Sequence, residues 1–140
     1  MSIKLKISPE SGFLHVGATG EFSLEEAKRV FIEMLEAVAQ HQIGKVLLDG
    51  RELAGNPRFM ERFYYSEFAA ETVSKFAARG GLPATQFAYV MVIPMRDPGK
   101  FGETVAVNRG MNMKVFDNPD DAFEWLGISP AGKPKAGADK

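Results

Sequence analysis

Two short, almost uninterrupted apolar runs constrain the fold of this chain more than any other feature of its sequence. Val46-Leu47-Leu48 is followed by Asp49-Gly50, and the second run extends from Phe87 to Pro94. Runs of this kind are typical of strands that are buried on both faces, as in a mainly parallel sheet. Parallel neighbours need a long crossover connection, which is usually a helix. The sequence therefore predicts an α/β fold with helices on both faces of the sheet.

The segment before the first run has the pattern of an amphipathic helix. Ser23 and Glu26 have the spacing of a capping box, in which each side chain accepts a hydrogen bond from the other residue's backbone N–H. Apolar residues then recur at three- and four-residue intervals, at Leu24, Ala27, Val30, Phe31, Met34, Leu35 and Val38. This pattern predicts a helix that starts after Ser23 and ends between His41 and Gly44.

Three further helices are marked by proline at their first residue. They are predicted at 57–78, at about 99–109 and at 119–126. Asn or Asp is favoured at the N-cap and Pro at the first helical position. This combination occurs at Asn56-Pro57, Asp97-Pro98 and Asn118-Pro119. The repeated pair therefore predicts where each of these helices starts.

The first residues predict an antiparallel hairpin at the edge of the sheet. Ile3, Leu5 and Ile7 alternate with Lys and Ser, which is the period of a half-exposed strand, and a turn at 9–12 leads to a second strand at 13–18. A short last strand is predicted at 113–116.

The predicted order is β-β-α-β-α-β-α-β-α. It describes a single α/β domain, residues 1–128, with a mainly parallel sheet of about five strands, an antiparallel N-terminal edge strand and four helices. Residues 129–140 are rich in Gly, Ala, Pro and Lys, and we expect them to form a disordered tail.

The composition excludes several classes of function. The 140 residues contain 17 Lys and Arg against 18 Asp and Glu, a net charge of -1, so the basic surface of a nucleic-acid-binding protein is not expected. Without cysteine, the chain has no disulfide, zinc–thiolate site or thiol nucleophile. The longest apolar run, Phe87 to Met95, is too short to span a bilayer, and the N-terminal residues do not resemble a signal peptide. We therefore expect a cytoplasmic protein without a membrane span.

Four local patterns resemble those of STAS domains, the domains of anti-sigma-factor antagonists, and more closely those of small bacterial STAS-like proteins grouped with CRAL-TRIO lipid-transfer domains. The patterns are Phe22-Ser23-Leu24-Glu25-Glu26, Leu47-Leu48-Asp49-Gly50-Arg51-Glu52, Lys100-Phe101-Gly102-Glu103-Thr104-Val105-Ala106-Val107-Asn108-Arg109-Gly110 and Phe123-Glu124-Trp125-Leu126. The resemblance implies a STAS-like fold and a binding role. It also implies a phosphorylatable serine at the start of the helix after the second pattern, but the chain has no Ser or Thr between Gly50 and Tyr65.

Charged residues follow the two apolar runs, where a parallel sheet would bind a ligand. Ligands of such sheets bind at the carboxyl ends of the strands, near helix N-termini. The candidates are Asp49, Arg51 and Glu52 after the first run, and Arg96 and Asp97 after the second. The two arginines could hold an anion. The alternative is that all five residues form turn caps and solvated ion pairs, which contribute little energy.

No catalytic or metal-binding motif occurs in the sequence. His15 and His41 each lack a second histidine or a carboxylate at ligand spacing, and there is no nucleophile elbow, P-loop or zinc-protease motif. We therefore expect a protein that is not an enzyme and has no metal or cofactor. An acid–base enzyme would have to use Asp49, Glu52 or Glu103.

The most unusual feature is the number of aromatic residues in the first turns of helix 57–78. A helix that packs on one sheet face needs a single apolar stripe, which we assign to Phe59, Phe63, Ala70 and Val73. Tyr64, Tyr65 and Phe68 then point away from this stripe. They could be covered by a thick core with tyrosine hydroxyls that reach water, by a second chain, or by a small ligand beneath the helix.

The sequence favours a non-enzymatic regulatory or protein-binding module. Self-association, or the docking of a protein partner, would use the aromatic half of helix 57–78, with interface candidates Phe59, Met60, Tyr64, Tyr65 and Phe68. The alternative is a carrier or sensor that binds a small amphipathic or anionic ligand between this helix and the strand ends.

Overall fold

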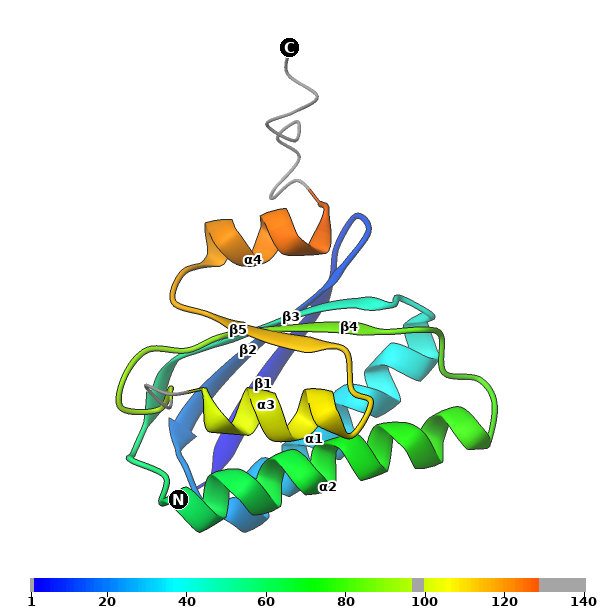
Figure 1. Ribbon diagram of the computed structural model, residues 1–140. Coiled ribbons are helices and arrows are strands. Elements are labelled where there is room, and N and C mark those ends of the chain that lie inside the picture. Colours follow the sequence, from blue (N-terminus) through cyan, green and yellow to red (C-terminus); the bar gives the residue numbers. More distant parts are fainter. Residues whose placement is uncertain (1, 97–99, 129–140) are drawn as a thin grey trace.

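The computed structural model describes residues 2–96 and 100–128 and has the predicted order of strands and helices (Figure 1). The elements are β1 (Ile3–Pro9), β2 (Leu14–Glu21), α1 (Leu24–His41), β3 (Lys45–Ala54), α2 (Phe59–Ala78), β4 (Gln86–Val90), α3 (Phe101–Asn108), β5 (Met113–Phe116) and α4 (Pro119–Leu126). The predicted α/β fold is therefore confirmed. The tail predicted at 129–140 lies outside the described residues.

The described strands form a five-stranded sheet in the order β1-β2-β3-β4-β5. β1 runs antiparallel to β2, from the pair Ile3 and Gly20 to the pair Pro9 and Leu14. The other neighbouring strands are parallel. This arrangement confirms the antiparallel edge strand that the alternating N-terminal residues predict.

Helices cover the two faces of the sheet unequally. α1, α2 and α3 lie on one face, and α4 lies alone on the other (Figure 1). α2 is the farthest of these helices from the sheet, and it packs on α1 and α3. It therefore forms an outer layer above the region between these two helices. Within the described residues, no helix has both the length and the hydropathy that crossing a bilayer requires.

The core follows from the alternation of side chains along the strands. On the α1 side, buried residues include Leu14, Val16, Phe31, Leu35, Val46 and Phe87. On the α4 side, a smaller cluster consists of Phe13, Leu47, Ala88, Val90, Ala122 and Leu126. β4 contributes alternate residues to both clusters, which is why its sequence is an almost unbroken apolar run.

Two of the predicted helix caps are confirmed. The hydroxyl of Ser23 accepts the backbone N–H of Glu26 at 3.2 Å at the start of α1. The side chain of Asn118 accepts the backbone N–H of Asp121 at 2.9 Å at the start of α4. The pair Asp97-Pro98, predicted to start the third helix, lies outside the described residues.

The start of α2 differs from the prediction, because the helix begins at Phe59 and not at Pro57. Arg58 occupies the N-cap, and its backbone N–H donates to the carboxylate of Glu61 at 2.8 Å. Pro57 is buried before the helix, and its carbonyl accepts from the side chain of Arg62 at 3.0 Å. Side-chain contacts thus set this helix start, rather than the Asn-Pro pair.

Candidate functional site

α2 turns small residues, and not its first aromatic residues, toward the rest of the molecule. The residues buried along its inner side are Ser66, Ala69, Ala70 and Thr72. The large apolar residues of α2 that are exposed are Phe59 (61%), Met60 (47%) and Tyr64 (46%), on its outer side. The distance between packed helices depends on the side chains at their contact, so short residues let α2 approach α1 and α3. The predicted stripe is therefore wrong at Phe59.

Tyr65 and Phe68 pack on the inner side of α2, so of the three predicted covers they have the thick core. The ring of Tyr65 meets Phe31 of α1 edge-on, with 6.0 Å between ring centroids, and Phe68 meets the same ring at 6.5 Å. The ammonium group of Lys28 lies 5.3 Å from the centroid of the Phe68 ring. Two of the five interface candidates are therefore occupied by contacts within the chain.

Gly102 of α3 allows this helix to approach α2 closely. A Cβ atom at Gly102 would lie 2.9 Å from the hydroxyl oxygen of Ser66, which is tighter than a van der Waals contact. Ala69 of α2 and Ala106 of α3 are also short, and both face the volume between these helices and the sheet. Because these side chains end at Cβ, they leave part of that volume unfilled.

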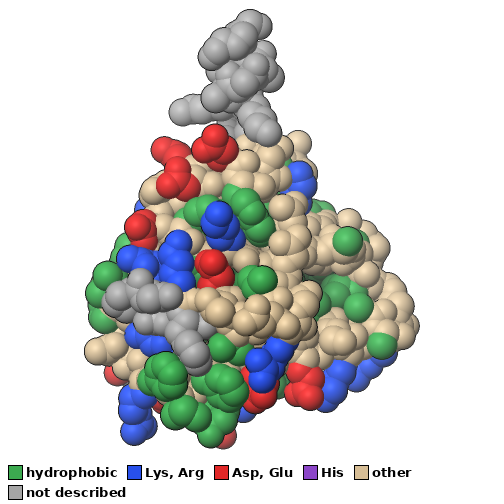
Figure 2. Space-filling model, viewed as in Figure 1, with side chains coloured by type: hydrophobic (Ala, Val, Ile, Leu, Met, Phe, Trp, Pro, Cys, Tyr) green, Lys and Arg blue, Asp and Glu red, His purple; other side chains and the backbone are tan. Residues whose placement is uncertain are grey.

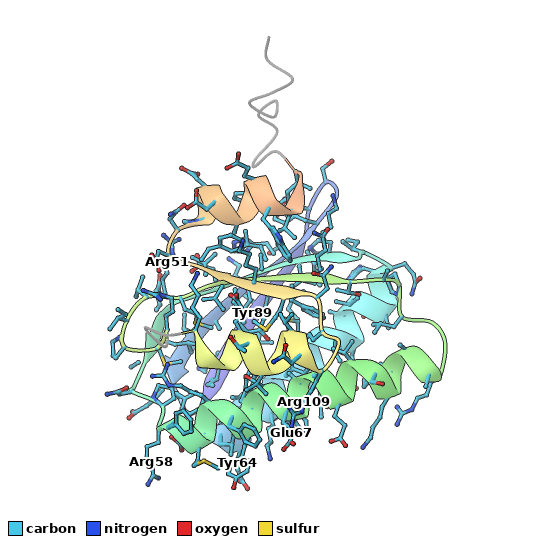
Figure 3. The ribbon with its side chains drawn as sticks, in the orientation of Figure 1. Arg51, Arg58, Tyr64, Glu67, Tyr89 and Arg109 are labelled. Atoms are coloured by element: carbon cyan, nitrogen blue, oxygen red, sulfur yellow. The ribbon has the colours of Figure 1, made fainter. Side chains whose placement is uncertain are left out.

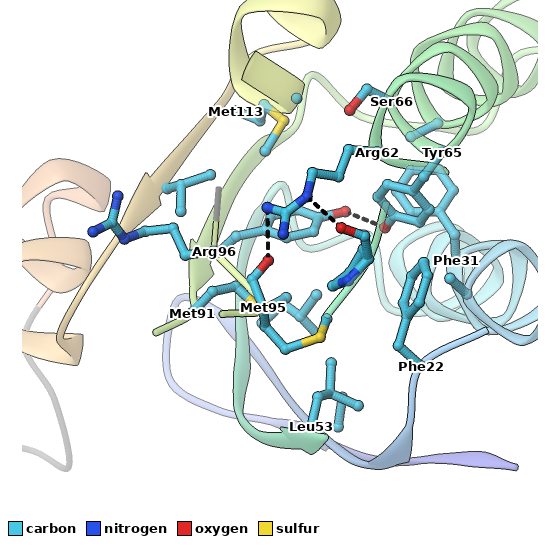
Figure 4. A pocket seen from close by; sticks show the side chains of 18 of the residues that line it. Phe22, Phe31, Leu53, Arg62, Tyr65, Ser66, Met91, Met95, Arg96 and Met113 are labelled. Carbon is cyan, nitrogen blue, oxygen red and sulfur yellow. Dashed lines mark hydrogen bonds between the residues drawn. The ribbon is translucent and has the colours of Figure 1, made fainter. Parts of the chain in front are cut away.

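A cavity of about 140 Å³ lies beneath α2, between the sheet, α1 and α3 (Figure 4). Residues from β1 to β5 and from α1, α2 and α3 line it. The lining is almost wholly apolar and includes Phe22, Phe31, Leu48, Leu53, Met91 and Met95. An apolar cavity of about 150 Å³ can bind benzene or xenon, so this cavity is large enough for a small ring.

Two tyrosine hydroxyls form a polar pair in this apolar cavity. The hydroxyl oxygens of Tyr65 and Tyr89 lie 2.7 Å apart, so one hydroxyl donates a hydrogen bond to the other (dashed line at Tyr65, Figure 4). Tyr89 lies in β4 and is only 4% exposed. Burial raises the pKa of both phenols well above its ordinary value. Both hydroxyls therefore stay protonated over the physiological pH range.

Arg62 fixes the loop after β4 against the start of α2. Its guanidinium donates to the carbonyl oxygens of Pro57 at 3.0 Å, Pro94 at 2.8 Å and Met95 at 3.3 Å. In Figure 4 its side chain extends from α2 toward the segment of Met95. The guanidinium also donates to the side-chain oxygen of Asn56 at 3.4 Å. No sequence pattern distinguishes Arg62 from a solvent-exposed arginine, because its other three acceptors are backbone carbonyls.

The other charged groups that border the cavity also have protein partners. The ammonium group of Lys100 donates to the carbonyl of Val115 at 3.2 Å, and the carboxylate of Glu103 accepts the backbone N–H of Val115 at 2.8 Å. Arg96 forms an ion pair with Asp117 at 2.7 Å. These contacts hold α3 and the loop before this helix against β5 and Asp117.

The residues predicted as a ligand site after the first apolar run lie within a strand. β3 continues to Ala54 because it pairs with β2 as far as Glu21. Asp49, Arg51 and Glu52 are therefore strand residues, and none of them lines the cavity. This corrects the prediction that they form a rim at the end of a short strand.

Asp49 and Arg51 form an ion pair with each other. The guanidinium of Arg51 donates to both carboxylate oxygens of Asp49, at 2.9 and 2.7 Å. These hydrogen bonds hold the pKa of Asp49 below its ordinary value, although partial burial opposes the shift. Of the candidates after the second run, Arg96 lines the cavity, and Asp97 lies outside the described residues. Of the four described candidates, Arg96 therefore lines the cavity and the other three do not.

An exposed apolar cluster covers the outer side of α2 at its start. We call Phe59, Met60 and Tyr64 the outer patch. Figure 2 shows hydrophobic side chains gathered over this end of the helix, and in Figure 3 Tyr64 and Arg58 point away from the sheet. Glu67 lies beyond the patch along α2 and forms an ion pair at 3.2 Å with Arg109, the C-cap of α3.

The described residues do not form a metal site. Among them, no three His, Asp or Glu side chains are grouped as ligands of a metal ion would be. Of the carboxylates considered for acid–base chemistry, Glu103 lines the cavity, while Asp49 and Glu52 do not.

Two solved structures share this architecture over nearly their whole length. An anti-sigma factor antagonist from Mycobacterium paratuberculosis aligns with a TM-score of 0.57 and 17% identity, over 90% of this chain and 95% of that chain. The anti-sigma factor antagonist SpoIIAA in its unphosphorylated form aligns with a TM-score of 0.53 and 10% identity, over 90% of this chain and 99% of that chain.

An uncharacterised protein of the DUF3478 family from Shewanella loihica PV-4, described as having a SpoIIAA-like fold, aligns with a TM-score of 0.48 and 20% identity, over 89% of this chain and 93% of that chain. No protein-family model matches this chain, and no curated protein matches it significantly. The two antagonist structures show that the chain has a STAS-like fold, which confirms the fold that its sequence resemblance implies.

Proposed function

We propose that this protein is a non-enzymatic regulatory module that binds a protein partner, and that this partner is a second copy of the same chain. The observation that carries the proposal is the outer patch, whose side chains are 46 to 61% exposed. Clustered exposed apolar side chains often mark an interaction site, and aromatic residues and Met are enriched in such sites. The STAS-like fold supports a partner-binding role, because the two proteins that share it are named as antagonists of anti-sigma factors.

Charges at the two ends of the outer patch favour self-association. Arg58 has an 86% exposed side chain at one end of the patch, and the half-exposed Glu67 lies at the other. When two copies of α2 pack antiparallel about a twofold axis midway between these residues, Arg58 of one copy lies opposite Glu67 of the other. The apolar residues between them then face each other, as a self-complementary twofold interface requires.

Sedimentation velocity from low to high micromolar concentration tests this proposal. We expect a dimer whose fraction rises with concentration, and a monomer when Tyr64→Glu places a charge in the interface. Tyr64→Phe is the matched control, because it keeps the ring, and it should still dimerise. A wild-type protein that stays monomeric throughout, or a dimer that Tyr64→Glu leaves intact, contradicts the proposal.

A charge exchange tests the antiparallel arrangement. Arg58→Glu alone should weaken the dimer, because it places two like charges opposite each other. Arg58→Glu combined with Glu67→Arg should restore part of the affinity, since Glu67→Arg also breaks the ion pair with Arg109 within each chain. If the double variant is as weak as the single variant, the dimer has a different geometry.

A second candidate function, the binding of a small ligand, is favoured by the cavity beneath α2. Its volume of about 140 Å³ and its apolar lining suit a small apolar molecule. In a titration with benzene followed by NMR, we expect shifts of backbone amides that line the cavity, such as those of Leu48 and Ala69. If these amides do not shift, the second candidate function is contradicted.

A further inference from the structure

We infer that the cavity beneath α2 selects a neutral ligand with an apolar body and one acceptor oxygen, such as a ketone, and that the Tyr65–Tyr89 pair donates a hydrogen bond to this oxygen. The inference rests on the second candidate function, ligand binding, and specifies its chemistry. It follows from the number of hydroxyl hydrogens, the position of the pair and the charges around the cavity.

The tyrosine pair has one more hydroxyl hydrogen than its own hydrogen bond uses. Each phenol carries a single donor hydrogen, and the bond of 2.7 Å between Tyr65 and Tyr89 uses one of the two, whichever residue is the donor. Among the described residues, each of these two hydroxyls has only the other as its hydrogen-bond partner. A buried donor without an acceptor costs free energy. The second hydrogen is therefore available to an acceptor in the cavity.

The position of the two tyrosines places this donor inside the cavity. Tyr89 comes from β4 in the sheet, Tyr65 comes from α2 above it, and both line the cavity. Around them lie the rings and chains of Phe31, Met34 and Leu48. A ligand in this space contacts apolar groups on most of its surface and meets the hydroxyl pair at one point, which fixes its orientation.

The charges around the cavity favour a neutral ligand over a carboxylate. The guanidinium of Arg62 already donates to three backbone carbonyls. Lys100 is bound to the Val115 carbonyl, and Arg96 is paired with Asp117. To pair with one of these cations, a carboxylate would therefore have to displace a backbone carbonyl or Asp117 from it, and a buried carboxylate that does not form such a pair is strongly unfavourable. A carbonyl or ether oxygen needs only the hydrogen that the tyrosine pair offers.

Two ligands of the same shape separate the contribution of the hydrogen bond from that of apolar packing in the cavity. Cyclohexanone and methylenecyclohexane have the same ring, but only the ketone has an acceptor oxygen. Each is titrated into the full-length protein, and the dissociation constant is taken from the shifts of cavity-lining amides. The variant is Tyr65→Phe with Tyr89→Phe, because either tyrosine alone could still donate to the ligand. Tyr64→Phe, on the outer side of α2, is the matched control.

We expect the double variant to bind cyclohexanone roughly three- to tenfold more weakly than the wild type, the loss of one hydrogen bond. Its affinity for methylenecyclohexane should not fall, and Tyr64→Phe should change neither. If the double variant keeps its affinity for the ketone, or loses affinity for both ligands equally, the inference is overturned while ligand binding stands. If neither ligand shifts the cavity amides of the wild type, the inference and the second candidate function both fail.

Two further measurements use the wild-type protein and do not depend on the folding of a variant. The carbonyl stretch of bound cyclohexanone should move to lower frequency than in a hydrocarbon solvent, as it does when the oxygen accepts a hydrogen bond. An unmoved stretch overturns the inference. Cyclohexanecarboxylate should bind more weakly than cyclohexanone, and tighter binding would overturn the choice of a neutral ligand.

Discussion

The hydroxyl oxygens of Tyr65 and Tyr89 lie 2.7 Å apart and join α2 to β4. α2 packs mainly on α1 and α3, so this bond connects the outermost helix of that face directly to the sheet. The pair also places a donor in an otherwise apolar cavity. The inner side of α2 thus carries a hydrogen bond to the sheet and a donor in the cavity, while its outer side carries the exposed patch.

The hydroxyl pair predicts a strongly non-additive mutation cycle. Tyr65→Phe or Tyr89→Phe alone leaves one buried hydroxyl without its partner, and each should lower the free energy of unfolding by about 1–2 kcal/mol. The double variant replaces both partners with rings of the same shape and should be nearly neutral. Urea denaturation of the four proteins measures the coupling. Additive losses would show that the two hydroxyls do not interact.

Arg62 should be important for stability although it is a charged residue on a helix. Arg62→Met removes the donor for the carbonyls of Pro57, Pro94 and Met95. We expect a loss of about 2 kcal/mol, since hydrogen bonds from a charged donor contribute more than neutral ones. Arg79→Met, at the exposed end of α2, is the control and should change stability by less than about 0.5 kcal/mol. Equal effects in urea denaturation would contradict this role of Arg62.

Gly44 is predicted to be intolerant of a side chain. A Cβ atom there would overlap the carbonyl oxygen of Ala84, a backbone atom that cannot rotate away. Gly44→Ala should therefore destabilise the protein by about 1–3 kcal/mol. Gly17→Ala is the matched control in β2, where a Cβ atom meets nothing within 4 Å. Thermal unfolding of both variants tests the prediction, which fails if their melting temperatures change equally.

The Asp49–Arg51 pair predicts a loss of stability in acid. The pKa of Asp49 is lowered in the folded state from its ordinary value of 3.8, chiefly by the hydrogen bonds from Arg51. The stabilisation is therefore complete above that ordinary value, and it is lost as the pH falls through the lowered pKa. Asp49→Asn should be less stable than the wild type at neutral pH, and the difference should vanish in strong acid. A difference that is the same at both pH values would contradict the prediction.

The order of elements was predictable because the apolar runs mark the buried strands and the cap residues mark the helix starts. The apolar run at Phe87 reflects a strand buried on both faces, and the Ser23 and Asn118 caps need only neighbouring backbone groups. The true length of β3 was not predictable in this way. The three charged residues Asp49, Arg51 and Glu52 interrupt its apolar pattern, and they are strand residues because this part of β3 pairs with β2.

The candidate site was only partly predictable, because periodicity does not show what a helix packs against. Large residues at Phe59 and Phe63 suggested a stripe facing the sheet, whereas α2 packs on two helices through Ser66 and Ala69. The sequence shows that Tyr65 belongs to an unusual aromatic cluster, but the periodicity places it on the wrong side of the helix. Its partner Tyr89 is one residue in an apolar run, and only the three-dimensional structure brings the two hydroxyls together.

The central claim, that the outer patch binds a second copy of the chain, is tested most directly by an intermolecular contact. In a mixture of isotope-labelled and unlabelled protein, a filtered nuclear Overhauser experiment detects proton pairs that belong to different chains. The antiparallel packing of α2 predicts a signal between the Met60 methyl group of one copy and the Tyr64 ring of the other. If this signal is absent at high micromolar concentration while the protein is dimeric, or if the protein is not dimeric at all, the claim is contradicted.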